Sequence, residues 1–112
     1  MRDPLVKAYG HVYPVTPALY ALESALHDAL NDDEDVPLLC QEGDMARISM
    51  EGSYFPEDEV VEAFRAHLTP DMLGKLDVLD MDGWRLTRHV FTGGQVKSSS
   101  APLNNVLDYS GH

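Results

Sequence analysis

The sequence predicts an α+β fold with a single antiparallel sheet, made of a two-stranded hairpin plus a three-stranded meander, and two main helices packed on one face. Residues 16–31 and 56–68 repeat apolar side chains at three- and four-residue spacing, which is typical of amphipathic helices. Residues 37–50 and 75–103 instead place β-forming residues around glycine-containing turns, which is typical of antiparallel strands. The expected order of elements is α-ββ-α-βββ-α.

The length of 112 residues, with 44% hydrophobic and 24% charged residues, is typical of one compact domain. Residues 1–14 are expected to form an N-terminal arm, because two prolines and a glycine interrupt any regular period there. A short strand around His11–Tyr13 is possible within this arm. Residues 15–112 are then expected to form the single α+β domain.

The first helix is expected to begin at Thr16-Pro17, where threonine caps the helix and proline takes the first helical position. Asn31 tolerates the left-handed conformation that ends many helices, so the helix is expected to stop there. The acidic run 32–35 follows and is interpreted as a solvated connection. A divalent-cation loop is the alternative, since carboxylates are the ligands of Ca²⁺, but no further ligand is fixed by the spacing.

The predicted two-stranded hairpin turns at Gly43-Asp44 and places Leu39 opposite Ile48. The second helix is expected to begin at Pro56, with acidic residues in its first turn where the helix dipole favours them. A last short helix is expected over residues 103–109.

The predicted meander has two-residue turns at Asp82-Gly83 and Gly93-Gly94, and these turns fix its register. The first turn places Leu79 opposite Leu86, and it brings two acids opposite two arginines, which supports the register. One face is expected to be the core, and the opposite face is expected to be polar. The expected core side chains are Leu79, Met81, Trp84, Leu86, Val90, Ala101 and Leu103, and the polar ones are Asp80, Arg85, Thr87, His89, Ser98 and Ser100.

The net charge of −11 disfavours binding to nucleic acid and to anionic membranes, which repel an acidic surface. No segment has the length and apolar character of a membrane span, so a soluble protein is expected. Cys40 is the single cysteine, which excludes an internal disulfide and a thiolate zinc site within the chain. A reducing, cytoplasmic location is therefore expected.

No catalytic residue, metal site or cofactor is expected from the motifs. Residues 80–83 match the middle of a calcium loop, but the first and last ligand positions of that loop are Val78 and His89. The five histidines do not occur at metal-ligand spacing.

The candidate binding residues lie in the predicted meander, where the only local concentration of positive charge occurs. They are Arg85, Thr87, His89, Lys97, Ser98 and Ser100. An idle, solvent-facing polar face is the simpler interpretation of most of them. The favoured function is a small noncatalytic protein-interaction or regulatory domain. The alternative is a small-molecule-binding protein or small enzyme with a pocket between helix and sheet, lined by Trp84, Tyr20 or Tyr54 with Asp77 and Arg88.

The final predicted strand, Gln95–Ala101, has few apolar side chains and is therefore expected to be a sheet edge. An edge strand offers unpaired backbone groups to a partner strand. The expected partner is a protein, most simply a second copy of the chain, and replacing Ser99 with proline tests this if its N–H points outward.

Overall fold

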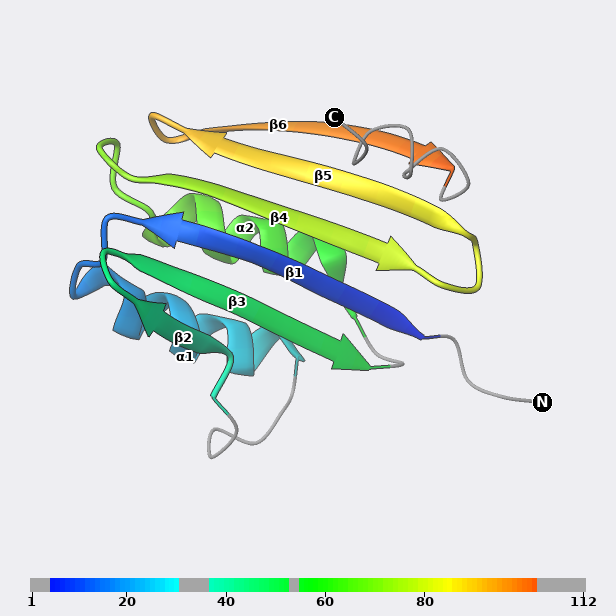
Figure 1. Cartoon of the computed structure of the whole chain (residues 1–112), viewed down its shortest axis with the longest axis horizontal. Helices are drawn as coiled ribbons and strands as arrows, with labels where there is room; N and C mark the ends of the chain where they lie inside the picture. The colour runs from blue at the N-terminus through cyan, green and yellow to red at the C-terminus, as the bar shows by residue number, and fades with distance from the viewer. Residues whose placement is uncertain (1–4, 31–36, 53–54, 103–112) are drawn as a thin grey trace.

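The computed structural model describes residues 5–30, 37–52 and 55–102, which form an α+β fold with two helices and one six-stranded antiparallel sheet (Figure 1). The strand order in the sheet is β2-β3-β1-β4-β5-β6. The elements in chain order are β1 (Val6–Tyr13), α1 (Ala18–Leu30), β2 (Leu39–Glu42), β3 (Met45–Gly52), α2 (Glu57–His67), β4 (Leu73–Asp80), β5 (Arg85–Thr92) and β6 (Gln95–Pro102). The acidic run 32–35, Tyr54 and the expected helix over 103–109 lie outside the described residues.

Strand β1 corrects the expected N-terminal arm, because Val6–Tyr13 forms a full strand at the centre of the sheet. It pairs with β3 on one side and with β4 on the other. The sequence obscured this strand because Gly10 interrupts its apolar alternation. In the structure Gly10 allows close packing, since a Cβ there would lie 2.0 Å from the backbone oxygen of Lys75.

Both predicted hairpin registers are confirmed. Leu39 pairs with Ile48 between β2 and β3, and Leu79 pairs with Leu86 between β4 and β5. The turn between β5 and β6 is the expected two-residue loop, in which Gly93 and Gly94 have φ values of 59° and 81°. Positive φ at both positions is the type I′ geometry that suits the twist of the flanking strands.

The predicted two-residue turn at Asp82-Gly83 is wrong, because the loop between β4 and β5 contains four residues, 81–84. The carboxylate oxygen Oδ1 of Asp80 accepts hydrogen bonds from the backbone N–H groups of Asp82 and Gly83, at 3.1 and 2.9 Å. Trp84, not Gly83, has positive φ, at 55°. The pairs from Asp80 with Arg85 onward are the same as predicted, and Met81 and Trp84, which a two-residue turn would pair, lie in the loop instead.

The predicted core face of the meander is also wrong, although the expected core residue Leu86 is buried on the open face. Leu76, Val78 and Phe91 face the helices, together with His89, whereas Leu79 and Val90 lie on the open face of the sheet. Trp84, expected in the core, is 53% exposed. Strand β4 carries apolar side chains on both faces. Its pairing with β5 therefore fixes the register but does not determine which face packs against the helices.

The core lies between the sheet and the two helices, which cover the same side of the sheet (Figure 1). Phe64 of α2 stacks on Phe91 of β5 with ring centroids 5.1 Å apart. The other fully buried large side chains come from both helices, from the loop before β4 and from the strands: Leu22, Leu26, Val60, Met72, Val12 and Leu76.

Candidate functional site

Five of the six candidate binding residues gather on the helix-facing side of the β5–β6 hairpin. Arg85, Thr87 and His89 alternate along β5, and Ser100 and Ser98 lie opposite Thr87 and His89 on β6. Both helices lie under the other strands, so this hairpin extends past the helical layer (Figure 1). The structure therefore leaves a polar shelf, which we define as Arg85, Thr87, His89, Ser98 and Ser100.

Lys97 does not belong to the polar shelf. It pairs with Val90, whose side chain is on the open face of the sheet, and successive residues of a strand point to opposite faces. The sequence placed Lys97 near the other candidates along the chain, but the two-residue period of the strand separates them.

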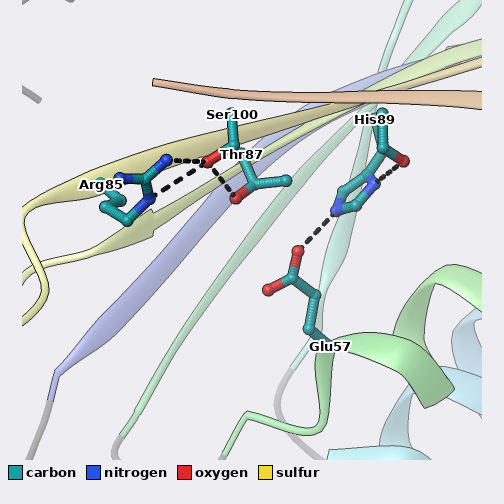
Figure 2. Close-up of polar contacts among 6 residues, drawn as sticks. Glu57, Arg85, Thr87, His89 and Ser100 are labelled. Carbon is teal, nitrogen blue, oxygen red and sulfur yellow. Dashed lines mark hydrogen bonds and ion pairs between the residues drawn. The ribbon is translucent and has the colours of Figure 1, made fainter. Parts of the chain in front are cut away.

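His89 of β5 links α2 to the edge strand β6 at one end of the polar shelf. Its side chain is buried, with Nδ1 2.7 Å from Oγ of Ser98 and Nε2 2.7 Å from Oε2 of Glu57 (Figure 2). A carboxylate only accepts hydrogen bonds, so Nε2 carries the proton that is donated to Glu57. In the neutral ring Nδ1 then accepts a hydrogen bond from the hydroxyl of Ser98.

The order serine, histidine, carboxylate also activates nucleophiles in hydrolases. In those enzymes the serine lies in a pocket beside donors that stabilise an oxyanion. Ser98 is instead exposed on the edge strand. We therefore interpret this contact as a structural link that satisfies a buried histidine and holds the first turn of α2 against β5.

At the other end of the polar shelf, three donors converge on one hydroxyl oxygen, Oγ of Ser100. Arg85 donates from Nε at 3.3 Å and from Nη2 at 3.1 Å, and the hydroxyl of Thr87 donates at 3.5 Å (Figure 2). A serine oxygen has two lone pairs, so this geometry uses its full accepting capacity. The hydroxyl proton of Ser100 remains to be donated to another group.

Arg85 differs from the other arginines in the part of the chain that the structure describes. Arg47, Arg65 and Arg88 each form an ion pair with a carboxylate. Arg85 donates instead to the hydroxyl of Ser100.

A second polar cluster lies on the open face of the sheet, where Arg88 forms two hydrogen bonds of 2.7 and 3.0 Å with Asp77. These bonds raise the pKa of the Arg88 guanidinium. Nearby, His11 is partly buried and lies beside Lys75, and burial followed by the charge of Lys75 lowers the pKa of its imidazole, against the weaker opposite effect of Asp77. The ion pair between Asp77 and Arg88 was expected from the register. These two residues do not line a pocket with Tyr20 or Trp84.

A hollow of about 340 Å³ lies between the start of α1 and the edge strand β2. Glu23 lines it and also accepts hydrogen bonds from the backbone N–H groups of Leu38 and Leu39, at 2.9 and 3.1 Å. The other lining residues are Val15, Thr16, Pro17, Leu19, Tyr20, Leu39, Gln41 and Ala46. Of the expected pocket residues that the structure describes, only Tyr20 lines this hollow.

Glu57 is the site residue that the sequence analysis did not identify. Its position in the first turn of α2 was explained by the helix dipole, which favours acidic side chains there. Its contact with His89 joins two residues far apart in the chain, so no local signal predicts it.

Among the described residues, no group of three or more histidine, cysteine, aspartate or glutamate side chains is arranged to hold a metal ion. Neither described helix is long and apolar enough to cross a bilayer. Comparisons of the chain with protein-family models, with curated proteins and with solved structures found no match.

Proposed function

We propose that this chain is a small, soluble, noncatalytic protein-interaction domain of the cytoplasm, which docks an extended segment of a partner protein along β6. The observation that carries the proposal is the position and character of β6. It is an eight-residue edge strand, and six of its eight residues are exposed. Such a strand presents a row of unpaired backbone groups that a partner strand can complete.

The turn before β6 determines which backbone groups point outward. Residues that flank a two-residue loop form a hydrogen-bonded pair, here Thr92 and Gln95, and the pattern alternates from there. Ser99 is therefore expected to bond to β5, and Ser98 and Ser100 are expected to direct their N–H and C=O groups away from the sheet. Pro102 falls in the outward series, where its missing N–H removes no bond to β5.

The side chains of β6 guard this edge only weakly. Natural edge strands are commonly blocked by charges, prolines or bulges. Between Gln95 and Pro102 the only charged residue is Lys97, and the only proline is the last residue. The middle of the strand, Ser98–Ser100, combines small side chains with free backbone groups, which suits strand addition.

The expected alternation of hydrogen bonds moves the decisive substitution from Ser99 to Ser98. Ser98→Pro removes an outward N–H and the hydroxyl, and Ser98→Ala removes only the hydroxyl, so the pair isolates the backbone group. We expect Ser98→Pro to weaken association and Ser98→Ala to retain it. Sedimentation equilibrium measures self-association, and affinity capture measures binding to a different partner. The proposal is contradicted if the wild-type chain is monomeric and Ser98→Pro still captures every partner that the wild type captures.

A second candidate function is small-molecule binding, favoured by the hollow between α1 and β2. Its volume of about 340 Å³ is at the lower end of ligand pockets, and its lining combines apolar side chains with the carboxylate of Glu23. Gln41→Trp would fill the hollow from its rim. We expect any compound that raises the melting temperature of the wild type through this site to lose that effect in Gln41→Trp, and an unchanged effect would exclude the site.

A further inference from the structure

The guanidinium of Arg85 is directed toward the sheet edge that the proposed docking uses. Arg85 belongs to β5, yet its Nε and Nη2 donate to Oγ of Ser100, which belongs to β6. The charged group therefore reaches the edge strand, next to the position of an added strand. A guanidinium has five N–H donors, so three remain for another acceptor.

The charge of Arg85 has no paired carboxylate in the described structure, although the chain has 19 acidic residues. The nearest acid in the register is Asp80, directly opposite Arg85, but its Oδ1 accepts the N–H groups of Asp82 and Gly83 in the loop. A neutral serine oxygen is a weaker partner for a guanidinium than a carboxylate, whose hydrogen bonds are charge-assisted. The cluster of Arg85, Thr87 and Ser100 thus has the donors of an anion site and only a hydroxyl as acceptor.

We propose that the segment docked along β6 carries an aspartate or glutamate whose carboxylate binds Arg85 and the hydroxyl of Ser100. This inference rests on the proposed docking and adds the chemistry of the partner. The acidic residue lies opposite Ser100 on the added strand, because directly opposed residues point to the same face. An added strand lies about 4.8 Å from β6, within reach of the guanidinium and the Ser100 hydroxyl.

The other end of the polar shelf restricts where this acid can be. The residue two positions along the added strand lies opposite Ser98, whose hydroxyl bonds His89, and His89 in turn bonds the carboxylate of Glu57. A second acid there would meet a negative charge, so a neutral side chain is favoured. The partner motif is therefore an extended segment with one acid opposite Ser100 and a neutral residue opposite Ser98.

A second copy of this chain does not supply such a motif through its own β6, because Gln95–Pro102 contains neither aspartate nor glutamate. Two-fold pairing of β6 would also bring two copies with a net charge of −11 together. Two-fold pairing of β6 with itself therefore does not provide the carboxylate, and we take the occupant to be an extended segment of a different protein that carries this one acid.

The test uses three fluorescein-labelled peptides with an alternating threonine-valine sequence that differ only at one central position, which is glutamate, glutamine or lysine. Fluorescence anisotropy measures their binding to the full chain. We expect the glutamate peptide to bind the wild type about tenfold more tightly than the glutamine peptide, the size expected for one charge-assisted contact. In Arg85→Gln this ratio should fall to about one.

Lys97→Gln is the matched control, because it removes one positive charge from the same hairpin but from the opposite face. We expect it to keep most of the tenfold preference. Arg85→Lys keeps the charge without the planar fork and should give an intermediate ratio. Circular dichroism and urea unfolding establish that each variant is folded.

Ser98→Pro separates failure of this inference from failure of the docking proposal. If the wild type binds the glutamate and glutamine peptides equally, and Ser98→Pro weakens both, docking stands and the carboxylate inference is wrong. A preference retained in Arg85→Gln also overturns the inference. If no peptide binds the wild type, or Ser98→Pro leaves binding unchanged, docking along β6 is wrong and the inference falls with it.

Discussion

Gly10 of β1 lies so close to β4 that any side chain there would meet the backbone oxygen of Lys75. We expect Gly10→Ala to lower the free energy of unfolding by about 3 kcal/mol, the upper end of the usual cost of overpacking, because backbone must move. Gly94→Ala is the control, since no atom lies within 4 Å of a Cβ there and the cost is only that of positive φ, about 1 kcal/mol. Urea unfolding compares the two, and equal costs would contradict the close approach.

Trp84 is a position where we do not expect substitution to lower the free energy of unfolding. Its side chain is 53% exposed, and its φ of 55° is strained for a residue with a Cβ. Trp84→Gly should therefore leave the free energy of unfolding unchanged or raise it by up to about 1 kcal/mol. Leu76→Ala, at a fully buried position, should lower it by about 2 to 5 kcal/mol. A larger loss from Trp84→Gly than from Leu76→Ala would show that the tryptophan packs in the core.

His11 gives stability a dependence on pH. Burial and the charge of Lys75 lower the pKa of His11 in the folded chain below its ordinary value of 6.5. The unfolded chain therefore takes up this proton more readily, and the stability present above pH 6.5 is lost as the pH falls through the folded pKa. We expect His11→Gln to flatten this part of the pH profile in urea unfolding. A histidine resonance of the wild type that titrates above 6.5 at this position would reverse the sign.

At the scale of elements, the first turn of α2 is held against β5 by the hydrogen bond between Glu57 and His89. We expect Glu57→Ala to destabilise the fold by about 1 to 3 kcal/mol, because a nitrogen of a buried ring loses its partner. Asp58→Ala removes an exposed acid from the same helical turn and should cost only the dipole interaction, about 0.3 to 1 kcal/mol. Thermal unfolding of both variants measures the difference, and equal losses would mean that the histidine contact contributes nothing.

The pairing of strands within each predicted hairpin could be predicted from the sequence, but the face of the sheet that the helices cover could not. Complementary pairs such as Asp77 with Arg88 fixed the register of β4 and β5, because opposed charges and apolar residues agree in only one alignment. Register does not say on which side the helices lie, and β4 is apolar on both faces, so the core face was predicted in reverse. Strand β1 was missed because Gly10 breaks its pattern.

The same distinction applies to the candidate site. Arg85, Thr87, His89, Ser98 and Ser100 were grouped correctly on one face because strand periodicity and the Gly93-Gly94 turn place them there. The burial of His89 and its contact with Glu57 depend on how helix and sheet pack, which no local pattern encodes.

At the scale of the whole molecule, the net charge of −11 opposes compaction, since the acidic residues repel one another. Salt screens this repulsion, so we expect the urea midpoint to rise between low-salt buffer and physiological ionic strength, with an unchanged m-value. Sodium chloride and choline chloride should act equally if screening is the cause. A midpoint that falls with salt would mean that ion pairs such as Arg88 with Asp77 outweigh the repulsion.

The central position of β1 has a consequence for folding during synthesis. Val6 pairs with both Gly52 and Asp80, so β1 is synthesised before β3 and β4 and has both edges covered only once β4 is available. The β2–β3 hairpin and the β4–β5–β6 meander need only contacts between neighbours along the chain, which form fastest. A nascent chain that stalls before Asp80 consequently exposes an apolar strand with an open edge, the kind of segment that chaperones bind and that drives aggregation between nascent chains.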